Sequence, residues 1–183
     1  MGNAIKNKWV LLISVAGTGT FLDLYTKHLA STHLIEGMQV PIAGRFFSFL
    51  LCFNKAALFG LDPRHLIPWF PLNGFFYVFS SIAVVVLIAY YASIKKTDWP
   101  LYWGLALILP GAFGNLFDRA LNVHRGVVDF LRLGVSDTLY WPIFNFADMY
   151  VTFGVAIILI GVLREGRKTE APEKAVAGDQ QKS

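Results

Sequence analysis

Four aspartates lie within or beside long apolar stretches of the sequence: Asp23, Asp118, Asp129 and Asp148. An ionised carboxylate well inside hydrocarbon costs at least ~2.5–3.5 kcal/mol on insertion scales, so such a residue is usually paired, protonated or functional. Two carboxylates a few ångströms apart share one proton. One can then act as base toward a water while the other hydrogen-bonds to the carbonyl under attack. The residue types therefore indicate aspartic-protease chemistry, although spacing alone does not choose the pair.

Two other kinds of site can be weighed from the same residues. His124 could join Asp118, Asp129 and Asp148 as metal ligands, but the chain has no His-Glu-x-x-His motif and no second histidine nearby. Cys52 is the single cysteine, which excludes an intramolecular disulfide framework, and we expect it to be a packed, inert thiol. We therefore expect neither a metal nor an organic cofactor.

Composition and hydropathy predict the elements that carry these residues. With 55% hydrophobic and only 15% charged residues, the chain is too apolar for an ordinary soluble domain. Four apolar stretches have the length of roughly 17–25 residues that a membrane-spanning helix needs. They cover about 9–25, 67–94, 99–117 and 139–163. We predict a mainly α, integral membrane four-helix protein.

The remaining segments complete this prediction. Residues 1–163 would form a single membrane-embedded domain, whereas the polar residues 164–183 would form a disordered cytoplasmic tail. Between the first two spans, 38–54 has β-branched and aromatic residues bounded by proline and glycine, which is typical of short strands. We expect these strands to form a small sheet on the outer membrane surface.

The distribution of lysine and arginine orients the spans. Basic residues flank the four span ends that belong on the cytoplasmic side, namely Lys6, Lys8, Lys95, Lys96, Arg164, Arg167 and Lys168. Both termini are then cytoplasmic, and all four aspartates gather near the outer interface. That depth suits a hydrolase acting on an outer-leaflet substrate. The alternative, a proton- or ion-coupled small transporter, usually needs ionisable groups near the midplane. The net charge of +4 is not clustered as nucleic-acid binding requires.

Five short motifs then resemble one known family. They are "DLYTK" (23–27), "NKAALF" (54–59), "GAFGNLFDR" (111–119), "GVVDF" (126–130) and "FNFAD" (144–148). They occur in the order found in lipoprotein signal peptidase, or signal peptidase II, and they cover the membrane body at about 9–163. The resemblance implies a multi-pass bacterial inner-membrane aspartic endopeptidase with its active site at the periplasmic face. It would cleave the signal peptide from prolipoproteins immediately before a diacylglyceryl-modified cysteine.

The same resemblance implies roles for individual residues. The catalytic dyad falls on Asp129 and Asp148, within a fold of four helices, an outer β-cradle and a short outer helix near the second motif. The family's substrate-binding positions fall on Asn54, Asn115, Arg119 and Asn145. The supporting positions fall on Asp23, Lys27 and Asp118. The inhibitors globomycin and myxovirescin are expected to block this site.

Three positions depart from the family's usual motifs. Ala56 replaces a glycine, Leu58 replaces an alanine and Pro110 replaces the first of two glycines. These departures bear on the flexibility of the loop over the site and on inhibitor sensitivity more than on the reaction. The outer connection at 131–143 has no assignment.

Overall fold

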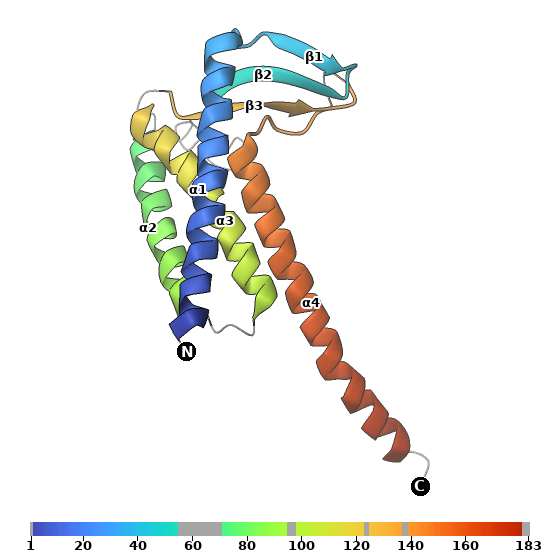
Figure 1. The fold of residues 1–183 in the computed structure, drawn as a ribbon. Coiled ribbons are helices and arrows are strands. Elements are labelled where there is room, and N and C mark those ends of the chain that lie inside the picture. Colours follow the sequence, from blue (N-terminus) through green and yellow to red (C-terminus); the bar gives the residue numbers. More distant parts are fainter. Residues whose placement is uncertain (1, 55–70, 95–97, 123–124, 137–138, 181–183) are drawn as a thin grey trace.

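The computed structural model describes residues 2–54, 71–94, 98–122, 125–136 and 139–180, with side chains described between Lys8 and Glu165 (Figure 1). Its elements are α1 (Gly2–His33), β1 (Gln39–Ala43), β2 (Phe47–Asn54), α2 (Leu72–Ser93), α3 (Trp99–Leu121), β3 (Val127–Leu133) and α4 (Phe146–Gln180). In Figure 1 the small sheet lies across one end of the helices, and the chain termini lie at the other. This mainly α architecture of four helices with a small sheet confirms the predicted fold class, whereas the short outer helix expected near the second motif falls outside the described residues.

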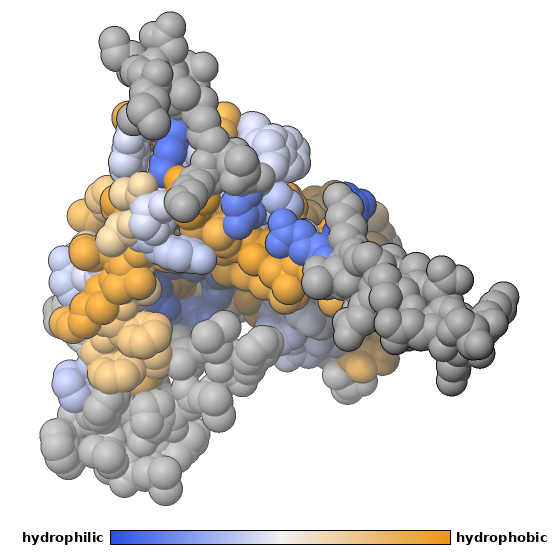
Figure 2. Space-filling model, turned by 90° about the horizontal axis from the view of Figure 1, so that it is seen from below, coloured by the Kyte–Doolittle hydropathy of each residue, from blue (hydrophilic) through white to orange (hydrophobic). Residues whose placement is uncertain are grey.

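The four described helices each contain a stretch long and apolar enough to cross a membrane. These stretches are Lys8–His33, Leu72–Ser93, Trp99–Leu121 and Phe146–Glu165. Large apolar side chains such as Phe21, Val85 and Leu159 are more than half exposed. Figure 2, seen from the end of the molecule opposite the sheet, shows hydrophobic colour over much of the described surface. Such a surface suits contact with lipid, because its exposed side chains are apolar and the helices satisfy their own backbone hydrogen bonds. The four predicted spans are confirmed.

The boundaries of the helices differ from the prediction at several places. The first helix is longer than 9–25 because it continues to His33, and the third ends at Leu121 rather than at 117. The second begins at Leu72, directly after Pro71, whereas its predicted start at 67 lies outside the described residues.

The predicted start of the fourth helix at residue 139 is wrong, since α4 begins at Phe146. The preceding segment is extended and pairs with the end of β3. Trp141 N donates to Leu133 O at 2.8 Å and Phe144 N donates to Leu131 O at 3.0 Å. Pro142 has no N–H and is poorly suited to a helix interior, whereas it is tolerated beside a sheet edge. The described part of the unassigned connection after β3, including 139–143, therefore pairs with the end of that strand.

The segment 164–183, which we predicted to be a tail, continues α4 directly. Helix α4 continues to Gln180, so only 181–183 lie outside the described residues. The segment 164–180 is rich in Glu, Lys, Arg and Ala, which are strong helix formers. Adding residues to an existing helix also avoids the cost of nucleating a new one.

The sheet is antiparallel with the order β1-β2-β3. Strands β1 and β2 confirm the prediction for 38–54, and Gly44 between them has φ +55°, a left-handed conformation that glycine adopts without strain. Strand β3 was not predicted. It pairs with β2 so that Asp129 is opposite Cys52 and Val127 is opposite Asn54. Asp129 thus lies on a strand, in the interior of the protein.

Helices α3 and α4 approach closely through glycines. A Cβ atom added at Gly111 would collide with Ala147 O, and one added at Gly154 would lie 2.5 Å from Gly104 O. Small residues allow such close helix contacts in membranes. As a result, the first turn of α4 lies directly against α3, beneath the sheet.

Candidate active site

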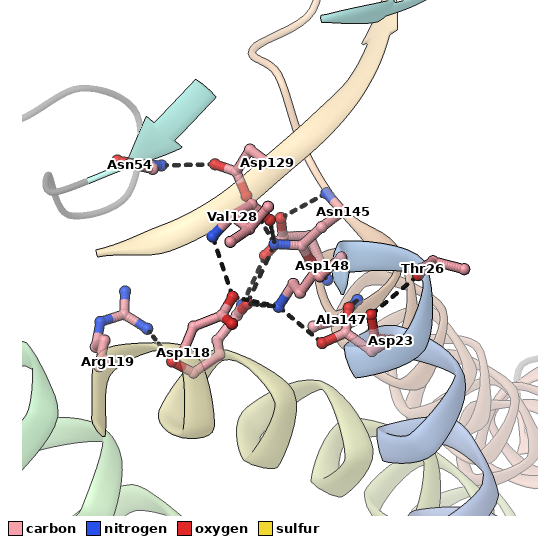
Figure 3. Close-up of polar contacts among 12 residues, drawn as sticks. Asp23, Thr26, Asn54, Asp118, Arg119, Val128, Asp129, Asn145, Ala147 and Asp148 are labelled. Atoms are coloured by element: carbon pink, nitrogen blue, oxygen red, sulfur yellow. Dashed lines mark hydrogen bonds and ion pairs between the residues drawn. The ribbon is translucent and has the colours of Figure 1, made fainter. Parts of the chain in front are cut away.

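Asp129 is a buried carboxylate held by two side-chain amides (Figure 3). Its side chain is only 2% exposed. Asn54 Nδ2 donates to Oδ2 at 3.0 Å, and Asn145 Nδ2 donates to Oδ1 at 2.7 Å. Burial, and then the negative charge of Asp148, raise the pKa of Asp129 to about 7, while the amide donors oppose that shift. Near neutral pH this carboxyl is therefore partly protonated.

Asp148 is held by the start of α4. Asn145 is the residue just before the helix, and its Oδ1 accepts from Asp148 N at 3.0 Å. In return, Asp148 Oδ2 accepts from Asn145 N at 3.1 Å. This reciprocal pair is a capping box, which satisfies two N–H groups that a helix start leaves without partners. The first turn of a helix also favours a negative charge. Local sequence therefore fixes the position of Asp148.

Two asparagines connect the two aspartates. Asn145 is fully buried, and its Nδ2 contacts Asn115 Oδ1 and Val128 O at 3.2 Å in addition to Asp129. Asn115 Nδ2 donates to Asp148 Oδ1 at 3.0 Å. Asn145 therefore bonds Asp129 through its side-chain Nδ2. It bonds Asp148 through its backbone N and its side-chain Oδ1. It fixes the two carboxylates relative to each other.

Lys27 lies at the centre of a second buried cluster. Its Nζ is 2.7 Å from Asp23 Oδ2, 2.9 Å from Asp118 Oδ2 and 2.9 Å from Asn115 Oδ1. Lys27 thus forms ion pairs with two carboxylates and donates a hydrogen bond to Asn115. Lys27 is 2% exposed and Asp23 is fully buried. We call Lys27, Asp23 and Asp118 the Lys27 cluster.

The Lys27 cluster holds the backbone next to each member of the proposed dyad. Asp118 Oδ2 accepts from Val128 N at 3.0 Å, and Val128 immediately precedes Asp129. Asp23 Oδ1 accepts from Ala147 N at 2.8 Å, and Ala147 immediately precedes Asp148. One ammonium thus joins the two carboxylates that hold strand β3 and the first turn of α4 in the site. Sequence reasoning did not identify these backbone partners.

Arg119 approaches the site from the end of α3. Its Nη1 donates to Asn115 O at 3.0 Å, and its Cζ lies 5.8 Å from the centroid of the Phe76 ring. Its charge interacts with both Asp129 and Asp148. Asn73, which sequence reasoning missed, donates to Arg119 O at 3.3 Å. Asn73 lies outside the five motifs. Its partner in this bond is a backbone oxygen, which any residue could supply, so the sequence shows no matching pair.

All nine predicted site residues are among the described residues and form one connected polar cluster. They come from α1, β2, α3, β3 and the first turn of α4, and their individual roles stay predictions. Among the described residues, no group of three or more His, Cys, Asp or Glu side chains could hold a metal ion. His124, which the metal hypothesis needs, lies outside the described residues, as do Ala56 and Leu58. Pro110 is buried inside α3, in a helix and not in a loop.

The chain was compared with known proteins. Residues 15–164 match the family model described as signal peptidase (SPase) II. The chain is 38% identical over 149 residues to the lipoprotein signal peptidase of Francisella tularensis subsp. novicida (strain U112), covering 80% of this chain and 88% of that protein. It is 32% identical over 149 residues to the lipoprotein signal peptidase of Clostridium novyi (strain NT), covering 81% and 95% respectively.

A solved structure gives the same result for the fold. A bacterial membrane enzyme, determined by the in meso method at 2.3 Å resolution, superposes with a TM-score of 0.71 at 25% identity. The match covers 85% of this chain and 88% of that one. The family match covers most of the chain and includes every predicted site residue. This chain therefore belongs to the signal peptidase II family of aspartic membrane peptidases.

Proposed function

We propose that Asp129 and Asp148 are the catalytic dyad of this signal peptidase. The observation that carries the proposal is the contact of Asn145 with both carboxylates, the buried Asp129 on β3 and the half-buried Asp148 at the start of α4. The reaction would remove the signal peptide from a prolipoprotein, cutting immediately before a cysteine that carries diacylglycerol.

The chemistry follows from one proton shared by the dyad. The ionised carboxylate takes a proton from a water, which attacks the scissile carbonyl. The protonated carboxyl hydrogen-bonds to that carbonyl oxygen, and a proton then passes to the nitrogen of the leaving amine. The raised pKa of Asp129 supports this division of roles near neutral pH. The apparent pKa values in a pH–rate profile would belong to the pair.

We place the protein in the bacterial inner membrane, with both termini cytoplasmic and the sheet at the periplasmic face. Support comes from the lysine and arginine distribution and from the position of the dyad at the sheet end of the helices (Figure 1). Among the described residues, Lys8 is the one buried charged side chain near the opposite end. A transporter would need a polar path between those ends, so the described residues favour the peptidase over the transporter alternative.

The remaining partners follow from this placement. The apolar part of the signal peptide would pack beside the helices, while Asn54, Asn115 and Arg119 would contact the polar segment around the scissile bond. Globomycin and myxovirescin would compete for the same position. No nucleic acid partner is proposed.

The test uses purified protein in detergent with two peptides, one carrying diacylglyceryl-cysteine and one unmodified. We expect cleavage of the first alone, and a loss of at least ~100-fold in turnover for Asp129→Asn or Asp148→Asn. Asp98→Asn is the matched control, because Asp98 caps the other end of α3 and asparagine caps equally well. Turnover within a few-fold of the starting protein in either dyad variant would refute the assignment.

A further inference from the structure

An apolar pocket lies beside the site, between the sheet end of α1, strands β2 and β3, and the start of α4. Its volume is about 590 Å³. We call it the α1–sheet pocket and define it by Ala30, Phe47, Phe49, Phe130 and Phe146. Ligand pockets commonly measure ~300–1,000 Å³. The pocket is therefore large enough for a ligand.

The walls of this pocket present hydrocarbon and offer little hydrogen bonding. Thr26 also lines it, but its Oγ1 already donates within α1 and lies 2.8 Å from Leu22 O and 2.9 Å from Asp23 O. His33 lies at the helix end, and its Nδ1 is 3.0 Å from Leu29 O. A peptide placed here would bury N–H and C=O groups without partners, which is costly. The chemistry fits a hydrocarbon chain instead.

The pocket shares two chain segments with the proposed dyad. Phe130 directly follows Asp129 on β3, and Phe146 lies two residues before Asp148 at the start of α4. Successive Cα atoms are only ~3.8 Å apart. In the proposed substrate, the sulfur that carries the lipid is three bonds from the scissile nitrogen. The substrate's hydrocarbon must therefore begin close to these two segments.

The pocket is also continuous with the surface of α1 that faces lipid. Leu29 lines the pocket and is 38% exposed, and Phe21, Leu22 and Tyr25 on the preceding turns are more exposed still. A chain lying in the outer leaflet could pass from this surface into the pocket without crossing a polar barrier. We propose that the α1–sheet pocket binds one acyl chain of the substrate's diacylglyceryl group.

This proposal rests on the proposed function and deepens it. Lipid tails are as apolar as leucine, so moving an acyl chain from lipid into the pocket gains little hydrophobic free energy. The pocket contributes position instead, because a chain seated there tethers the modified cysteine beside Asp129. Specificity for lipid-modified substrates then comes from the site's own architecture.

The first experiment is photocrosslinking with Asp129→Asn protein, which leaves the peptide uncut. The probe is a diacylglyceryl peptide with a diazirine in one acyl chain, and mass spectrometry maps the adducts. We expect adducts on Ala30, Phe49 and Phe130. Adducts restricted to lipid-facing residues such as Val85 would overturn the proposal. So would pocket adducts that form equally with a diazirine phospholipid and are not displaced by substrate, because bilayer lipid would then be the occupant.

The second experiment fills the pocket with Ala30→Phe and compares dipalmitoyl and dibutanoyl forms of one peptide. Because the seated chain positions the scissile bond, overpacking should lower kcat/KM for the dipalmitoyl peptide roughly 10- to 100-fold and leave the dibutanoyl peptide unaffected. Ser31→Phe is the matched control, since Ser31 is exposed and does not line the pocket.

The possible failures are distinguishable. Equal losses with both peptides, or no loss with either, would overturn the pocket proposal. If the starting protein cut neither acylated peptide, the proposed function would fail, and the crosslinking map would decide the pocket by itself.

Discussion

Replacing Lys27 by methionine tests whether one buried ammonium holds the site together. Methionine matches the length and apolar stem of lysine but removes the charge. Asp23 and Asp118 would then keep their bonds to Ala147 N and Val128 N but lose their shared counter-charge. Breaking a buried ion pair by removing one partner costs ~3–5 kcal/mol, because it leaves a buried charge uncompensated.

This loss is large compared with the stability of a protein domain, which is ~5–15 kcal/mol. For a chain of this size, each kcal/mol lowers the unfolding temperature by ~2–4 °C, so Lys27→Met should unfold about 6–20 °C lower. Turnover should fall as well, since both backbone positions beside the dyad lose their anchors. Thermal unfolding in detergent and cleavage of the diacylglyceryl peptide measure the two effects separately.

Two comparison variants sharpen this test. Lys8→Met removes a second nearly buried lysine, but among the described residues Lys8 Nζ bonds the carbonyls Ala92 O and Ile94 O and faces the Trp9 and Tyr91 rings, so no described carboxylate loses a counter-charge. The double variant Lys27→Met with Asp118→Asn removes one anion and should recover ~0.5–3 kcal/mol relative to additive losses. The reasoning is refuted if Lys27→Met unfolds no earlier than Lys8→Met, or if the double variant shows no recovery.

Three further predictions concern single positions. Because burial raises the pKa of Asp129 to about 7, the folded protein binds this proton more tightly than the unfolded chain. Its stability should therefore fall as pH rises from ~4 to above ~7. Asp129→Asn should abolish that fall in unfolding temperature. Gly114→Ala would place a Cβ 2.9 Å from Asp23 Cγ and should cost ~1–3 kcal/mol in thermal unfolding. Gly74→Ala meets no atom within 4 Å and should cost nothing. Burial, and then the charge of Asp129, raise the pKa of the Cys52 thiol to about 12. Iodoacetamide at neutral pH should therefore label Cys52 far more slowly than free cysteine. Mass spectrometry of the labelled protein measures this rate.

The membrane-spanning helices could be predicted because hydropathy is a strong signal over such lengths. The start of α4 was missed because the run from Leu139 to Leu163 is apolar for most of its length, so hydropathy alone does not mark the change to helix. The local signal was present: Asn145 and Asp148 have the spacing of a capping box, and Pro142 precedes them.

Strand β3 was missed for a different reason. Its sequence, VVDFLRL, is rich in β-branched and apolar residues, but Asp129 and Arg132 suggest an exposed loop. Both side chains are buried and have partners. Asp129 accepts from the two amides described above, while Arg132 donates to Ser136 O at 3.1 Å and its Cζ lies 4.6 Å from the Tyr140 ring centroid. Such partners become visible only once the chain has folded back on itself.

The motifs located the site residues but not how the site is held. The bond between Asp23 and Ala147 joins positions 124 residues apart, and its donor is a backbone N–H that any residue could supply. The same applies to Asp118 and Val128. A supporting carboxylate with a backbone partner leaves no recognisable pair in the sequence, which is why Asp23 and Asp118 could be predicted as supports without a mechanism.

The charge balance of the described site connects its stability with its chemistry. The site contains four carboxylates and two cations, namely Asp23, Asp118, Asp129, Asp148, Lys27 and Arg119. If all were ionised, the cluster would carry two excess negative charges in a buried place. The first turn of α4 offsets about half a charge, and a proton shared by the dyad offsets one more. The proton that the dyad uses in catalysis therefore also reduces the excess negative charge of the folded site. A substitution that neutralises the dyad should therefore raise the free energy of unfolding and stop the reaction. Such a trade-off between stability and activity is expected where an active site gathers like charges.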